Sequence, residues 1–176
     1  MKQINVKNKL KEYFFLHPTT KLRVRQIERE VKAPLPSVIR YTKELEKESI
    51  LKSTPIANIV VYSADRTSNK FILEKRLFNI RQLYSSGLLD YLVTELSNSL
   101  IVVFGSFSRG EDVENSDIDF YIETPAKKKF NLEKYERNLQ RKIQIIWSKH
   151  IYQIENKELA NNIINGIKLN GFMEVL

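Results

Sequence analysis

Two aspartates that alternate with apolar residues are the strongest chemical signal in this sequence of 176 residues. Asp117 and Asp119 flank Ile118, and Phe120 follows them. Side chains of an extended strand alternate between its two faces, so the two carboxylates share one face while Ile118 and Phe120 point into a core. Proteins commonly hold Mg2+ with one or two carboxylates together with the phosphates of a substrate. The pair therefore predicts a Mg2+ site, with both aspartates in catalytic and metal-binding roles, for phosphoryl or nucleotidyl transfer.

A turn suited to phosphate binding precedes the two aspartates. An apolar run leads into Gly105 and Ser106, where a helix is expected to begin. Glycine lets the backbone approach an anion closely, and the first N–H groups of a helix would face a phosphate. Arg109 follows about one helical turn later, where its guanidinium would reach a phosphate, and a surface ion pair with a neighbouring acid is the competing interpretation. We predict Gly105, Ser106 and Arg109 as nucleotide-binding residues.

The combined pattern resembles the signature of the nucleotidyltransferase superfamily related to DNA polymerase beta. The sequence GSFSRG followed by SDIDF is similar to the minimal nucleotidyltransferases of archaea and bacteria. This resemblance implies a small mixed-sheet fold, Mg2+ as the cofactor, and transfer of a nucleoside monophosphate from an NTP, with ATP expected, to a hydroxyl acceptor. Such proteins are often paired with a helical HEPN-type partner in toxin–antitoxin-like modules, so the resemblance also implies that partner.

One position departs from the pattern of active relatives. They generally carry a third carboxylate on the strand that follows the aspartate pair, and here Gln144 stands in its place. An amide is neutral near pH 7, cannot serve as a base and is a poor Mg2+ ligand beside a carboxylate. Three acids nearby in the sequence are candidates to substitute for it: Glu111, Asp112 and Glu123.

The first 64 residues carry nearly all of the net charge. They hold 13 Lys and Arg against six Glu, a balance of +7, whereas the whole chain carries +8. A basic segment beside a nearly neutral one suggests contact with a polyanion, most often nucleic acid. A solvated lysine-rich surface is the simpler alternative.

Apolar spacing in this basic segment predicts three helices and a hairpin. The helices are expected at 6–15, around Ile27 and Val31, and from Ser37 as the N-cap, before strands at 50–54 and 59–62. This order resembles a winged helix-turn-helix, whose third helix would enter the major groove of duplex DNA. Winged helices also dock proteins or mediate dimerisation, and that alternative stays open. The residues predicted to bind DNA are Ser37, Arg40, Tyr41 and Lys43.

The sequence thus predicts an α+β protein with a winged helix-turn-helix followed by a small mixed-sheet nucleotidyltransferase fold. Polar residues after 64 mark a boundary, and helical patterns follow before the apolar strand. Past the aspartates we expect a helix at 132–140, a strand at 143–147, a helix at 159–167 and a tail with Gly166 and Gly171. The predicted domains are 1–64 for the winged helix, 65–98 for linking helices and 99–176 for the transferase.

Composition excludes several other kinds of protein. The absence of cysteine rules out disulfides, thiolate zinc sites and cysteine catalysis. The first residues have no signal-peptide character, and no apolar run approaches the roughly 20 residues of a membrane span. We therefore expect a cytoplasmic protein without membrane contact. A homodimer is a further expectation. Two function classes remain: a Mg2+-dependent nucleotidyltransferase, and a DNA-binding regulator whose degenerate transferase domain serves nucleotide sensing or dimerisation.

Overall fold

The computed structural model of the chain describes residues 5–96, 99–125 and 128–174. Contacts divide the chain into two compact units, Met1–Phe78 (unit 1) and Asn79–Leu176 (unit 2). The border between the units falls inside helix α4 (Asn69–Ser85). The predicted domains 1–64, 65–98 and 99–176 stay a prediction, because contacts do not show which segments fold independently.

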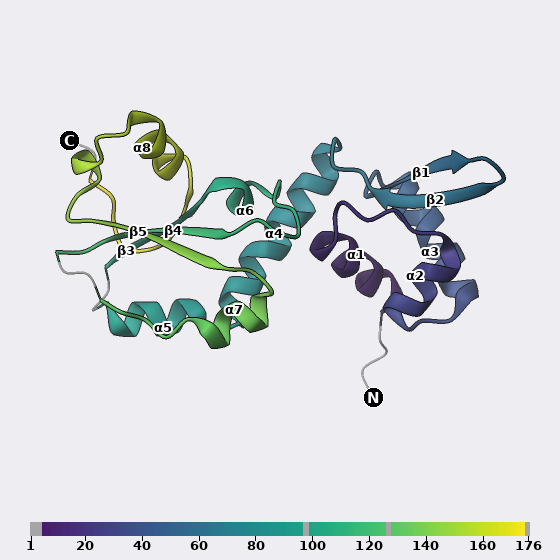
Figure 1. Ribbon diagram of the computed structural model, residues 1–176, viewed down its shortest axis with the longest axis horizontal. Helices are drawn as coiled ribbons and strands as arrows, with labels where there is room; N and C mark the ends of the chain where they lie inside the picture. The colour runs from purple at the N-terminus through teal and green to yellow at the C-terminus, as the bar shows by residue number, and fades with distance from the viewer. Residues whose placement is uncertain (1–4, 97–98, 126–127, 175–176) are drawn as a thin grey trace. The chain divides into compact units, whose positions relative to one another are not determined.

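Unit 1 contains three helices, a two-stranded antiparallel sheet that follows them, and the first part of α4 (Figure 1). Its apolar side chains form one core, in which Leu10, Phe14, Ile27 and Leu45 are fully buried. This core explains the helices, since each one turns its apolar stripe inward. The elements are α1 (Val6–Leu16), α2 (Val24–Val31), α3 (Leu35–Lys47), β1 (Leu51–Ile56) and β2 (Ile59–Ala64).

The start of α3 differs from the sequence prediction. Pro34 holds the N-cap position and α3 begins at Leu35, so Ser37 lies inside the first turn and is not the N-cap. The backbone N–H of Ser37 donates to the carbonyl of Pro34 at 3.0 Å. Pro36 fits the first turn because the missing N–H would have no helical partner there. The prediction of Ser37 as a cap was wrong because the two prolines were assigned to a turn.

Unit 2 is built on a four-stranded mixed sheet with the order β5-β4-β3-β6. Strand β3 is antiparallel to both of its neighbours, β4 and β6, while β4 and β5 run parallel. The mixed sheet and the α+β class agree with the sequence prediction. The strands are β3 (Leu100–Phe104), β4 (Ile118–Glu123), β5 (Ile143–Ser148) and β6 (Ile167–Asn170).

Helices cover both faces of this sheet (Figure 1). One face packs against α5 (Leu88–Glu95), α7 (Glu133–Leu139) and the end of α4, and the other packs against η1 (Ile151–Gln153) and α8 (Lys157–Ile164). Alternation along β4 serves both layers, since Phe120 belongs to the first core and Tyr121 to the second. The short helix α6 (Gly105–Arg109) follows β3 directly.

The last strand was not predicted. The sequence suggested a helix to residue 167 and then a tail, whereas α8 ends at Ile164 and β6 pairs with β3. This pairing joins segments far apart in the chain, so no local pattern indicates it. A Cβ on Gly166 would lie 2.7 Å from the carbonyl oxygen of Val103. Glycine is therefore required where the chain approaches β3.

Within the described residues, no helix is long and apolar enough to cross a membrane. The longest of them, α4, has 17 residues and carries charged side chains along its length. The cytoplasmic location stays a prediction.

Candidate active site

The two aspartates lie where β4 begins. Asp119 is within the strand and half-buried, whereas Asp117 precedes it and is exposed. Ile118 lies between the two aspartates and Phe120 follows Asp119. They are 0% and 1% exposed, so their predicted burial is confirmed. Asp119 pairs with Phe104, the residue directly before Gly105. The register of β3 and β4 thus brings the predicted phosphate turn to the aspartates.

The electrostatics of this pair favour a cation. Burial raises the pKa of the Asp119 carboxyl, and the negative charge of Asp117 raises this pKa further. In the described part of the chain, neither carboxylate has a hydrogen bond or an ion pair with a protein group. Oxygen donors of this kind suit a hard divalent cation, which would offset both the repulsion and the cost of burial. The donor set therefore fits Mg2+.

Replacing Asp119 with asparagine is expected to stabilise the protein in metal-free buffer. A raised native pKa makes stability fall as pH rises from the ordinary value of 3.8 through the native value, and this loss persists at neutral pH. Asp119→Asn removes the cost of holding a charged carboxylate at this half-buried position, so the variant should have a higher Tm than the parent at pH 7. The difference in Tm should disappear in acid, where Asp119 of the parent is protonated. Asp117→Asn should raise Tm less, because burial is the larger cause. A lower Tm for Asp119→Asn without metal, measured by circular dichroism, would contradict this account.

Gly105 lies against Asp119. A Cβ built on Gly105 would be 2.6 Å from Oδ2 of Asp119, and the φ angle of this glycine is +72°. The left-handed conformation strains any larger residue at this position, and a Cβ there would displace the Asp119 carboxylate. The Ser108 hydroxyl donates to the carbonyl of Gly105 at 2.9 Å, and Ser106 lies beside it in α6. The structure thus places Gly105, Ser106 and Asp119 together, as the sequence suggested.

Substituting Gly105 tests whether the close approach matters beyond the backbone angle. Gly87 has a φ of +75° and nothing within 4 Å of a built Cβ, so it is the matched control. Gly87→Ala should cost about 1 kcal/mol of unfolding free energy from the left-handed conformation alone. Gly105→Ala should cost more, because the new Cβ displaces the Asp119 carboxylate. Chemical denaturation measures both, and equal losses would show that the contact with Asp119 is unimportant.

Comparison with protein families identifies this region. Residues 85–170 match the family model described as a nucleotidyltransferase domain. This match supports the nucleotidyltransferase superfamily for the matched segment. Neither the comparison with curated proteins nor the comparison with solved structures gives a match. The match covers β3, α6, β4 and β5, and so includes both aspartates and the turn at Gly105.

Gln144 lies next to Asp119 in the matched segment. The two residues are partners in the parallel register of β4 and β5, so their side chains share one face of the sheet. The sequence assignment of Gln144 to the place of the third acid is therefore consistent with the register. Among the residues with a described position, no group of three or more His, Asp or Glu side chains could hold a metal.

The three acids considered as substitutes have other partners. Oε2 of Glu111 accepts a hydrogen bond from Nε of Arg109 at 2.7 Å. Oδ1 of Asp112 accepts from Asn79 at 2.7 Å, and the side chain of Asp112 is only 1% exposed. Glu123 lies at the far end of β4 and accepts from the backbone N–H of Ile151 at 3.0 Å. None of them takes the place of the third carboxylate in this structure.

Arg109 contacts Glu111 rather than the turn. Its Nε lies 2.7 Å from Glu111 Oε2, and both side chains are about half exposed. The surface ion pair that competed with phosphate binding is therefore present. To bind a phosphate, Arg109 must release Glu111 and pair with the anion. Breaking a surface ion pair of this kind costs little free energy.

A buried polar network that sequence reasoning missed supports the loop before β4. Asn79 Nδ2 donates to the carbonyl of Phe107 in α6 at 2.9 Å and to Asp112 at 2.7 Å. Arg141, before β5, lies 3.6 Å from the other oxygen of Asp112. The network thus ties the middle of α4 to α6 and to the segment that carries Asp117. Its members are far apart in the chain, so only a search for paired buried polar residues could have suggested it.

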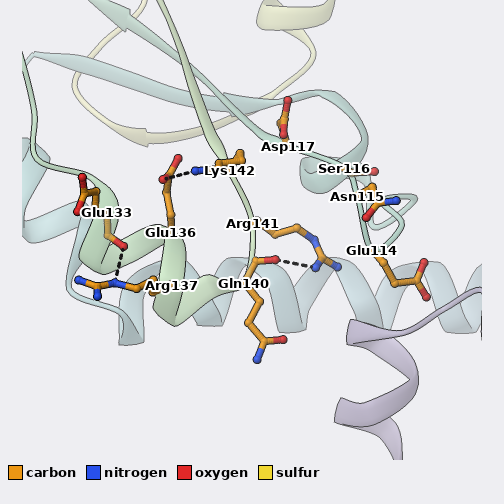
Figure 2. A pocket seen from close by; sticks show the side chains of 10 residues that line it. All are labelled: Glu114, Asn115, Ser116, Asp117, Glu133, Glu136, Arg137, Gln140, Arg141 and Lys142. Atoms are coloured by element: carbon orange, nitrogen blue, oxygen red, sulfur yellow. Dashed lines mark hydrogen bonds and ion pairs between the residues drawn. The ribbon is translucent and has the colours of Figure 1, made fainter.

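A pocket of about 520 Å3 opens beside Asp117 (Figure 2). Its walls come from residues 114–117, from α7 and from residues 140–142. Glu136 accepts from the backbone N–H of Ile143 at 3.0 Å and from Lys142 at 3.1 Å, and these bonds lower the pKa of Glu136. Of the site residues predicted from the sequence, only Asp117 lines this pocket. The sequence contained no signal for it.

The residues predicted to bind DNA lie along α3 of unit 1. Ser37 is half-buried in the first turn, and Lys43 is exposed. The guanidinium of Arg40 lies 4.4 Å from the centre of the Tyr41 ring. Nε of Arg40 lies 3.5 Å from Oε1 of Glu44. Arg40 and Tyr41 thus contact each other, and the charge of Arg40 is partly balanced by Glu44.

Proposed function

We propose that the nucleotidyltransferase domain transfers a nucleoside monophosphate from an NTP, with ATP as the first candidate, to a hydroxyl acceptor. The observation that carries this proposal is the contact of the Gly105 turn with the Asp119 carboxylate, within a segment that matches the nucleotidyltransferase family. Asp117 and Asp119 would hold Mg2+, which supplies charge neutralisation at the phosphates when bound. The family match supports nucleotidyl transfer, while the metal and the acceptor are parts of the proposal.

The chain's own groups would position the triphosphate. Gly105 leaves room for the backbone to approach an anion, and the N–H groups and hydroxyl at Ser106 are donors at the start of α6. In the transfer, a bond forms between the acceptor oxygen and the α-phosphorus, and the bond from that phosphorus to pyrophosphate breaks. The acceptor hydroxyl must also lose its proton. Gln144 cannot take that proton, so we expect deprotonation of the acceptor hydroxyl to be slow.

A second function is favoured by Gln144 and by the charge of the first 64 residues. A DNA-binding regulator would need the turn and the two aspartates for nucleotide sensing but not a third carboxylate. In this proposal, unit 1 is a winged helix-turn-helix that binds duplex DNA, and Ser37, Arg40, Tyr41 and Lys43 of α3 face the groove. Three helices, a hairpin and a balance of +7 support it.

The proposed HEPN-type partner rests on the family resemblance. A HEPN-type protein in a toxin–antitoxin-like module and a second copy of the chain are the protein partners, and the cytoplasm is the proposed location. Co-expression with a candidate HEPN-type protein, followed by size-exclusion chromatography with light scattering, tests both assemblies.

Incubation of the full chain with labelled NTPs, Mg2+ and candidate acceptors separates the two functions. The transferase proposal expects a labelled product and released pyrophosphate. The regulator proposal expects binding of NTP and Mg2+ without a product. Absence of both binding and product, with the protein shown to be folded, would refute both roles for this site.

A further inference from the structure

We propose that a groove between α2 and β2 of unit 1 binds the phosphate backbone of duplex DNA and supplies more of the affinity than α3 does. This inference rests on the proposal that unit 1 binds DNA, and it names the surface that holds the phosphates. The groove was not predicted, since none of the residues that sequence reasoning assigned to DNA contact lines it.

Three arginines line this groove, which has a volume of about 490 Å3. Arg23 precedes α2, and Arg25 and Arg29 are one helical turn apart on it, so the cations share one side of the helix. Strand β2 contributes an apolar side, where Val60 is 47% exposed. The complete lining is Arg23, Val24, Arg25, Gln26, Arg29, Ile59 and Val60.

These arginines keep their charge available for a ligand. All three are exposed, and no ion pair joins their guanidinium groups to an acid in the part of the chain that the structure describes. The two acids of α2, Glu28 and Glu30, do not line the groove. A free guanidinium presents several donors in a planar fork that matches two phosphate oxygens.

Helix α3 offers less free positive charge. Glu44 lies 3.5 Å from Arg40 and 3.5 Å from Lys7, so it offsets cations on its own helix and on α1. Two further acids, Glu46 and Glu48, follow near the end of α3. A DNA backbone would meet these carboxylates along the second half of the helix. The groove at α2 has no acid in its lining, so electrostatics favour it as the phosphate contact.

The chemistry of the lining favours a nucleic acid backbone over an acidic protein. A DNA backbone presents phosphates beside apolar sugar surface, and the groove presents guanidinium groups beside Ile59 and Val60. The amide oxygen of Gln26 accepts from the backbone N–H of Arg23 at 2.9 Å, which leaves its NH2 group to donate to a ligand. Duplex DNA is the proposed ligand, and duplex RNA and an acidic peptide are alternatives that the test separates.

The test compares charge-matched variants of the full chain. Arg25→Ala with Arg29→Ala removes two charges from the groove, and Arg66→Ala with Arg76→Ala removes two exposed charges that do not line it. Arg40→Ala with Lys43→Ala removes two charges from α3. Binding to a labelled 20-base-pair duplex is measured by fluorescence anisotropy between roughly 50 and 200 mM salt.

The groove variant should bind DNA about 50-fold more weakly near 100 mM salt. A plot of log association constant against log salt concentration should be less steep by about two, because two phosphate contacts are lost. The control pair should change affinity by less than about threefold, and the α3 pair should lie between. Arg25→Lys with Arg29→Lys should bind more tightly than the alanine pair but less tightly than the parent. Lysine keeps the positive charge but lacks the planar guanidinium that matches two phosphate oxygens. Thermal melts must show that every variant is folded.

Three results would overturn the inference while the DNA-binding proposal stands. They are equal losses in the groove and control variants, a larger loss in the α3 variant, and undiminished binding in the groove variant. Failure of the parent chain to bind any duplex would instead refute DNA binding itself, and the inference with it. Tighter binding of duplex RNA or of a polyglutamate peptide than of duplex DNA, lost in the groove variant, would show a groove with a different ligand and overturn the assignment to DNA.

Discussion

Replacing either Asp117 or Asp119 with asparagine is expected to reduce nucleotidyl transfer by about three orders of magnitude. Each change removes a negative charge from the proposed Mg2+ site, where the metal would stabilise charge on the phosphates by several kcal/mol. Three orders of magnitude correspond to about 4 kcal/mol in the barrier. Asp119 should be the more sensitive position, since it is half-buried against Gly105, whereas Asp117 is exposed.

Initial rates with labelled NTP measure this loss, and calorimetry with ATP and Mg2+ measures binding. Asp90→Asn is the matched control, because it makes the same chemical change at an exposed position of α5. Its rate should stay within about twofold of the parent. Weaker Mg2+-dependent binding in both aspartate variants, with no product from any protein, would favour the regulator. Full transfer by Asp119→Asn would refute the proposed site.

Changing Gln144 to glutamate is expected to accelerate transfer by about 10- to 1000-fold, on the usual scale of general-base effects. The side chain at this position lies on the same face of the sheet as Asp119, its partner in the β4–β5 register. Gln144 is exposed at the edge of the sheet, so glutamate can enter without displacing a packed side chain. The new carboxylate would accept the proton of the acceptor hydroxyl or bind a second cation.

Gln153→Glu controls for the added charge, since Gln153 is exposed in η1 of the same unit. It should leave the rate within about twofold of the parent. The rate with Gln144→Glu should also rise with pH as the new carboxyl ionises. A parent chain that already transfers at an ordinary enzyme rate and is slowed by Gln144→Glu would contradict this view, because Gln144 would then have a role of its own.

The elements with strong local patterns were predictable from the sequence. Helical spacing indicated α1, and alternation around Asp119 indicated a strand with Ile118 and Phe120 buried, which the structure confirms. These signals are local, because an amphipathic helix or strand must turn its apolar side chains to one face whatever it packs against. The start of α3 and strand β6 were missed. A proline pair permits either a turn or a helix start, and β6 exists only through its pairing with β3.

By itself, the sequence determined which groups are available for chemistry: two aspartates, a Gly-Ser turn and an amide in place of a third acid. Only the tertiary structure decided their neighbours. Strand register put Gln144 beside Asp119, and the close approach of Gly105 to that carboxylate follows from the pairing of β3 with β4. Side-chain pairing in space left Arg40 partly balanced by Glu44, while the arginines at α2 kept their charge. Such neighbours are separated along the chain and come together only on folding, so periodicity and composition contain no record of them.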